Sequence, residues 1–96
     1  MDEATRKEIL DGGRKAHELT ESAYRDNPAT RGQAAWAEKQ RILLADMALH
    51  LLQTALRDGA LPADELKRNL HAILTVSEQF IPDQGLKAIA DRLYAD

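Results

Sequence analysis

Two histidines in this sequence each have an acidic residue four positions away, and these pairs are the residues best placed to do chemistry. His50 follows Asp46, and Glu21 follows His17. On a helix, side chains four residues apart lie on the same face and can meet. An imidazole and a carboxylate together could bind a divalent metal ion, although each pair alone supplies only two ligands.

Two such helices facing each other could in principle combine both pairs into a four-ligand site, as in carboxylate-bridged helical bundles. Those bundles direct more glutamates inward than this sequence offers. We therefore expect both pairs to be contacts on helix surfaces, each contributing a few tenths of a kcal/mol. No metal ion or other cofactor is expected. The third histidine, His71, lies among charged residues and is expected to be exposed.

Residues for nucleophilic catalysis are scarce. The chain has no cysteine, and its two serines, Ser22 and Ser77, lie within helical patterns. Neither serine follows the strand-to-helix turn that exposes a catalytic nucleophile. The Gly12-Gly13 pair lacks both the preceding strand and the spacing of a phosphate-binding loop. We therefore expect no catalytic residue and no enzymatic activity.

Length and charge narrow the remaining classes. The 96 residues predict one domain, 1–96, and the net charge of −3 is mild. Basic and acidic residues alternate along the chain, so no polybasic surface for nucleic acid is evident and a nucleic-acid partner is disfavoured. A secretory signal and a membrane-spanning stretch are both missing from the sequence, and the expected location is the cytoplasm.

The composition predicts an all-α protein. Leu, Ala, Glu, Lys and Arg are plentiful and favour helix, whereas β-branched and aromatic residues are few. Turn signals at Asn27-Pro28, Gly59 and Ile81-Pro82 divide the chain. We predict a small helical bundle of three main helices and a short C-terminal one, covering approximately 2–25, 28–58, 62–80 and 83–95.

Adjacent glycines interrupt the first predicted helix. Two glycines inside a helix cost roughly 2 kcal/mol relative to alanine. We expect a kink or a break at Gly12-Gly13, and the alternative is that the glycines let another helix approach closely.

The second predicted helix is apolar around most of its circumference. Between residues 42 and 57 only Asp46, His50, Gln53 and Arg57 form a continuous polar line. Such a helix must be covered from more than one side. A span of 28–58 would also be roughly 45 Å long, whereas a compact chain of this size has a radius of gyration of about 12–13 Å. We therefore predict that a second copy covers part of it.

The predicted interface is centred on that helix. Its candidate residues are Trp36, Leu44, Met47, Ala48 and Leu51. The expected function is a non-enzymatic protein–protein interaction module, a homodimeric regulator, adaptor or inhibitor that occupies the surface of a partner protein. Two alternatives are a helical regulator associated with nucleic acid and a structural subunit of a larger assembly.

Overall fold

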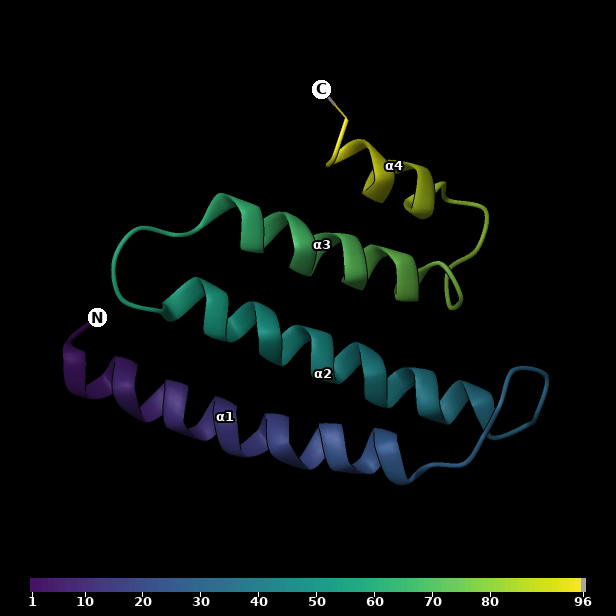
Figure 1. Ribbon diagram of the computed structural model, residues 1–96, viewed down its shortest axis with the longest axis horizontal. Helices are drawn as coiled ribbons and strands as arrows, with labels where there is room; N and C mark the ends of the chain where they lie inside the picture. The colour runs from purple at the N-terminus through teal and green to yellow at the C-terminus, as the bar shows by residue number, and fades with distance from the viewer. Residues whose placement is uncertain (96) are drawn as a thin grey trace.

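Four α-helices make up the protein, whose computed structural model describes residues 1–95 (Figure 1). Consecutive helices run antiparallel along the chain. The all-α prediction, with three long helices and a short C-terminal one, is confirmed. The last residue of the predicted domain, Asp96, lies outside the described range. The helices are α1 (Glu3–Asp26), α2 (Trp36–Leu56), α3 (Ala63–Ser77) and α4 (Leu86–Arg92).

These helices form a single layer. Figure 1 looks down the shortest axis, and the molecule measures 45 × 37 × 16 Å. Within residues 1–95, each helix packs only on its neighbours in chain order. The radius of gyration is 15.1 Å, compared with about 12.5 Å for a compact chain of this length. α2 is therefore flanked by α1 and α3, and its two other sides are open.

A single layer buries little. Among residues 1–95, only Ala29, Val76 and Ala90 are buried apolar residues, and no large side chain is fully buried. The buried residues of α2 are the polar Gln40, Asp46 and Thr54. The leucines of this helix are only partly covered. Most of the apolar side chains expected to form a core are thus partly and not fully buried.

The expected interruption at Gly12-Gly13 does not include a break, because α1 is one continuous helix from Glu3 to Asp26. Gly13 is buried against α2, and a Cβ atom there would lie only 2.8 Å from Cδ2 of Leu52. The alternative interpretation, a close approach of another helix, therefore describes Gly13. Gly12 faces open space.

The second helix is shorter than predicted, because residues 28–30 are irregular and residues 31–35 form turns. The Asn27 side chain accepts a hydrogen bond from the Ala29 backbone N–H at 2.9 Å. The backbone N–H of Thr30 donates to Gln33 Oε1 at 2.8 Å, and Gly32 has a left-handed φ of 95°. These local bonds compete with helix formation. The helix is about 32 Å long, so it does not project beyond the molecule as the 28–58 span implied.

The later helices are shorter as well. Residues 78–85 form turns between α3 and α4, with φ values of 67° at Asp83 and 69° at Gly85. A left-handed backbone ends a helix. The predicted spans 62–80 and 83–95 therefore shrink to the helical cores Ala63–Ser77 and Leu86–Arg92. Across residues 1–95, none of the helices has the length and apolar character required to cross a membrane.

Candidate functional site

The two faces of the layer differ in chemistry. One face is polar and carries a hollow of about 470 Å³ to which α1, α2 and α3 all contribute. Arg14, Gln53, Arg57 and Arg68 line it, together with His50. At 100° per residue, His50 and Gln53 lie on one side of α2, and Arg57 directly follows the end of this helix. Three of the four residues of the polar line recognised in the sequence thus line this hollow.

The opposite face is apolar. Ala37, Ala48 and Ala55 are exposed on α2, and their spacings of eleven and seven residues place them in one line. Ala48 lies about 200° around the helix from Asp46, on the other side of the layer. This line, with the exposed Leu19 of α1, belongs to what we call the apolar face. Its members are Ile9, Leu19, Ala23, Ala37, Leu44, Ala45, Ala48, Ala55, Leu70 and Leu74.

A shallow hollow of about 360 Å³ connects the α1 and α2 parts of the apolar face. Leu19 and Ala23 line it from α1, and Ala45 lines it from α2. The side chain of Leu19 is strongly exposed, at 67 %. The lining also includes Ile42 and the exposed ion pair of Arg41 with Glu38. An exposed apolar surface with polar residues at its rim is the kind of surface that proteins use to bind one another.

The residues predicted to form the interface lie on two sides of α2. Ala48 is exposed on the apolar face, and Leu44 lies beside it, partly covered. Gln40 accepts a hydrogen bond from Gln79, just beyond the end of α3, so this side of α2 faces α3. Met47 and Leu51 follow Gln40 by seven and eleven residues and therefore lie on the same side of the helix.

The fifth predicted interface residue is at the start of the helix. Trp36 is the first residue of α2 and is partly exposed. The whole interface assignment stays a prediction.

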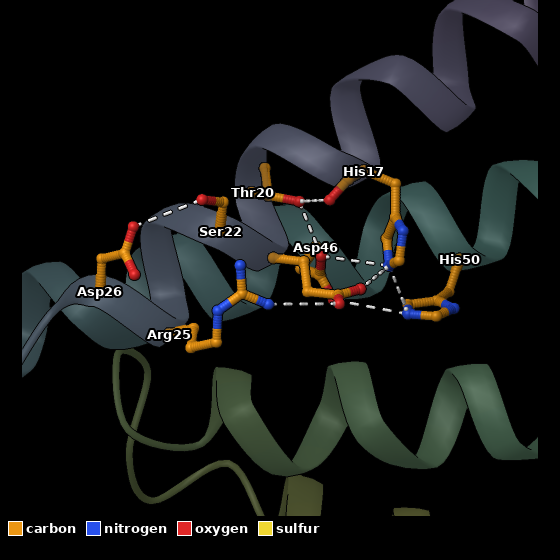
Figure 2. Close-up of polar contacts among 8 residues, drawn as sticks. His17, Thr20, Ser22, Arg25, Asp26, Asp46 and His50 are labelled. Atoms are coloured by element: carbon orange, nitrogen blue, oxygen red, sulfur yellow. Dashed lines mark hydrogen bonds and ion pairs between the residues drawn. The ribbon is translucent and has the colours of Figure 1, made fainter.

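A polar cluster joins α1 to α2, and one of its residues, His50, also lines the polar hollow (Figure 2). His17 comes from α1, and Asp46 and His50 come from α2. The Nε2 atoms of the two histidines are 2.9 Å apart. The Asp46 carboxylate lies 3.3 Å from His17 Nε2 through Oδ1 and 3.4 Å from His50 Nε2 through Oδ2. One residue from α1 thus meets both members of the α2 pair.

The cluster is closed on one side and open on the other. Asp46 has a side chain only 10 % exposed, and that of His17 is 18 % exposed. Thr20, one turn along from His17, donates its hydroxyl to Asp46 Oδ1 at 2.7 Å. His50 is 43 % exposed and opens into the polar hollow. A charge buried to this extent needs partners, and the cluster supplies them.

Glu21 lies at the edge of the cluster. Its Oε2 atom is 3.8 Å from His17 Nε2, and its Oε1 atom is 3.9 Å from the Arg25 guanidinium. Its side chain is 59 % exposed, so it can change rotamer without disturbing the helix. All four residues of the two sequence pairs are therefore neighbours in space.

This arrangement differs from the expectation of two separate contacts on helix surfaces. The sequence did contain a signal for a joint site, because both pairs have the same four-residue spacing on neighbouring helices. The shortage of glutamates was the reason why a joint metal site was not predicted. Two imidazoles and one carboxylate are already enough for three ligands, so glutamates are not required. Whether the helices face each other at these residues depends on their register, and the sequence pattern does not specify register.

The third histidine joins different elements. His71 Nε2 of α3 lies 3.0 Å from Asp91 Oδ1 of α4, and its side chain is 30 % exposed. Lys87 binds the same oxygen at 2.7 Å. Hydrogen bonds from Lys87 and then His71 lower the pKa of the Asp91 carboxyl. His71 is thus a contact between helices and is less exposed than expected.

Comparison with protein-family models, with curated proteins and with solved structures finds no match to this chain. Its function is therefore inferred from its own geometry.

Proposed function

We propose that this chain is a non-enzymatic protein-interaction module that pairs with a second copy of itself through the apolar face. The observation that carries the proposal is the single layer of helices. Domains normally consist of at least two packed layers with a hydrophobic core between them. A second copy, turned over by a twofold axis, would supply the second layer. The core would then lie between the two chains.

The surface area of the chain supports this arrangement. Its accessible surface is 6625 Å², whereas a compact monomer of 10.7 kDa has about 5,500 Å². The excess of about 1,100 Å² is similar to the roughly 800 Å² that each partner buries in a standard interface. The chain thus exposes about as much extra surface as one stable interface would remove.

The chemistry of the apolar face also suits a copy of the same chain. The three alanines exposed along α2, Ala37, Ala48 and Ala55, let two helix backbones approach closely, because the interaxial distance of packed helices depends on such side chains. The exposed Arg41 lies about 40° to one side of this line. Leu19 projects beside that line and can enter the corresponding hollow of the second copy. A twofold interface requires this type of self-complementary surface.

In such a dimer the two polar faces point outward. They would be the surfaces available to a partner protein, which the dimer would regulate, recruit or inhibit by occupying part of its surface. The arginines that line the polar hollow, Arg14, Arg57 and Arg68, are of the residue type enriched in binding hot spots.

The molar mass in solution tests the proposal. Size exclusion with light scattering, run over a hundredfold range of concentration, is expected to give twice the chain mass of 10.7 kDa at all but the lowest concentrations. A mass of one chain throughout that range would overturn the homodimer. A mass that falls on dilution would give the dissociation constant directly.

A further inference from the structure

We propose that His17, Asp46 and His50 form a binding site for one divalent transition-metal ion, with Zn²⁺ the ion that their chemistry fits best. The site lies on the polar side of the layer, where α1 meets α2 (Figure 2). It is separate from the apolar face proposed for self-association. The two proposals therefore succeed or fail independently.

The spacing of the donor atoms is the first reason. Two ligand atoms bound to the same ion at 2.0–2.1 Å, at a tetrahedral angle, are about 3.3 Å apart. The histidine Nε2 atoms are 3.3 and 3.4 Å from the nearer oxygens of Asp46, and 2.9 Å from each other. The two carboxylate distances run to different oxygens, Oδ1 and Oδ2, and the distance between the imidazoles is somewhat shorter than the tetrahedral value. One donor atom from each of the three residues nevertheless lies within 4.8 Å of the others, so small side-chain movements would bring all three onto one ion.

The donor types are the second reason. Two imidazole nitrogens and a carboxylate oxygen suit Zn²⁺ and its first-row neighbours, whereas Mg²⁺ and Ca²⁺ prefer sites made of oxygen alone. Three protein ligands leave a fourth tetrahedral position for water or another side chain. Glu21 is near enough to take that position, since its Oε2 atom lies 3.8 Å from His17 Nε2.

The support around the ligands is the third reason. The Thr20 hydroxyl binds Asp46 Oδ1 at 2.7 Å and holds the carboxylate in place. Hydrogen bonds of this kind to a ligand are typical of metal sites, because they orient the ligand. The Asp46 side chain is nearly buried, which limits its movement, while His50 lies open to the polar hollow through which an ion could enter.

A hydrogen bond between the two imidazoles is the competing explanation. One neutral ring can donate its Nε2 proton and the other can accept it, which accounts for the 2.9 Å contact without an ion. Only a change in properties on adding the metal ion distinguishes the two states.

The ion would fasten α1 to α2. Within residues 1–95, α1 packs on α2 alone, and its exposed leucine, Leu19, faces outward. Bridging His17 on α1 to both Asp46 and His50 on α2 would add a link that the unfolded chain lacks. Binding to the folded state alone raises its stability by mass action.

The test is a titration of the tag-free, metal-stripped full chain with Zn²⁺, and with Mg²⁺ as the comparison ion, followed by calorimetry. The expected result is one Zn²⁺ per chain, an increased melting temperature, and no heat with Mg²⁺. The NMR signals of the His17 and His50 imidazoles should shift together, and those of His71 should not.

Variants locate the site. His50→Gln removes the most exposed ligand and should weaken Zn²⁺ binding at least about tenfold, since even outer-shell changes cost that much in affinity. The matched control is His71→Gln, which removes a histidine that is also paired with an aspartate across two helices and should bind Zn²⁺ as the wild type does. Circular dichroism of both metal-free variants checks that each remains helical.

Three outcomes would overturn the metal site. They are no binding of Zn²⁺ up to millimolar concentration, unchanged affinity in the helical His50→Gln variant, and loss of binding in His71→Gln. Either of the first two would leave the hydrogen bond between imidazoles as the explanation of the cluster. None of the three would affect the proposed dimer, whose test is the molar mass without metal.

Discussion

Gly13 and Leu52 lie so close together that a side chain at position 13 would require Leu52 to move. A Cβ atom built on Gly13 would be 2.8 Å from Leu52 Cδ2, whereas one on Gly12 would meet nothing within 4 Å. The two adjacent glycines therefore differ in role, although both lie in the middle of one helix. Gly13 permits α1 and α2 to pack closely, while Gly12 only makes α1 less stable.

The first prediction follows from this contrast. Gly12→Ala should raise the free energy of unfolding by about 0.5–1 kcal/mol, because alanine favours helix and the new methyl group meets open space. Gly13→Ala should gain less or lose stability, because its methyl group forces Leu52 to move. Chemical denaturation of both variants measures the difference. Equal gains would show that the Leu52 contact has no energetic consequence.

The second prediction concerns the apolar face. Ala48→Glu should raise the dissociation constant of the dimer by about a hundredfold or more, because an unpaired carboxylate would be buried in the interface. Ala48 is exposed in the single chain, so the monomer should keep its fold. Light scattering and circular dichroism measure the two properties.

The matched control for Ala48→Glu is Ala4→Glu, the same change at an exposed alanine of α1 beside a hollow with a charged rim. It should leave the dimer intact. Equal dissociation of both variants would point to net charge as the cause, and a dimeric Ala48→Glu would remove this residue from the interface.

The third prediction concerns the bond between Thr20 and Asp46. Thr20→Val keeps the shape of the side chain but removes the hydroxyl that donates to Asp46 Oδ1. The nearly buried carboxylate then has one donor fewer, and the free energy of unfolding should fall by about 1–3 kcal/mol. Thr20→Ser keeps the hydroxyl and should lose less. Thermal unfolding without metal checks both, and equal losses would mean that packing of the threonine methyl group matters more.

The fourth prediction is a pH effect at the far end of the layer. Hydrogen bonds from Lys87 and His71 lower the pKa of Asp91 below its usual value of 3.8. A carboxyl whose pKa is lowered in the folded state stabilises the folded state at pH values above its usual pKa. This contribution to stability disappears as the pH falls through the lowered pKa. α4 should therefore loosen from α3 below about pH 4.

Hydrogen exchange measured by mass spectrometry between pH 3 and pH 7, corrected for the intrinsic rate, can follow α4 separately. Asp91→Asn should show the looser α4 already at pH 7. Protection of α4 that is independent of pH in the wild type would contradict this prediction.

The helical character of the chain could be predicted because it depends on local composition and turn residues. Pro62 and Gly59 marked real boundaries, since each acts through its own backbone. The extension of the second helix back to residue 28 was wrong for a related reason. Residues 28–35 include good helix formers, but side-chain hydrogen bonds such as that between Asn27 and the Ala29 backbone stabilise turns there instead. The sequence pattern does not reveal whether the helix or these turns are more stable.

The candidate sites could be predicted only in part. The i,i+4 spacing identified both pairs, His17 with Glu21 and Asp46 with His50, because that relation lies within one helix. Their meeting depends on which faces of α1 and α2 are in contact and in what register. The close approach at Gly13 helps to set that register, and the sequence alone left it as one of two interpretations.

The chain-order packing of the helices has a consequence for how the protein folds and opens. Since each helix within residues 1–95 contacts only the helices next to it in sequence, the layer resembles a short repeat array whose stability is a sum of neighbour terms. Contacts between elements close in sequence favour fast folding. Either end can also detach while the middle stays intact, so α1 and α4 should exchange their amide protons earlier than α2, each at a rate of its own.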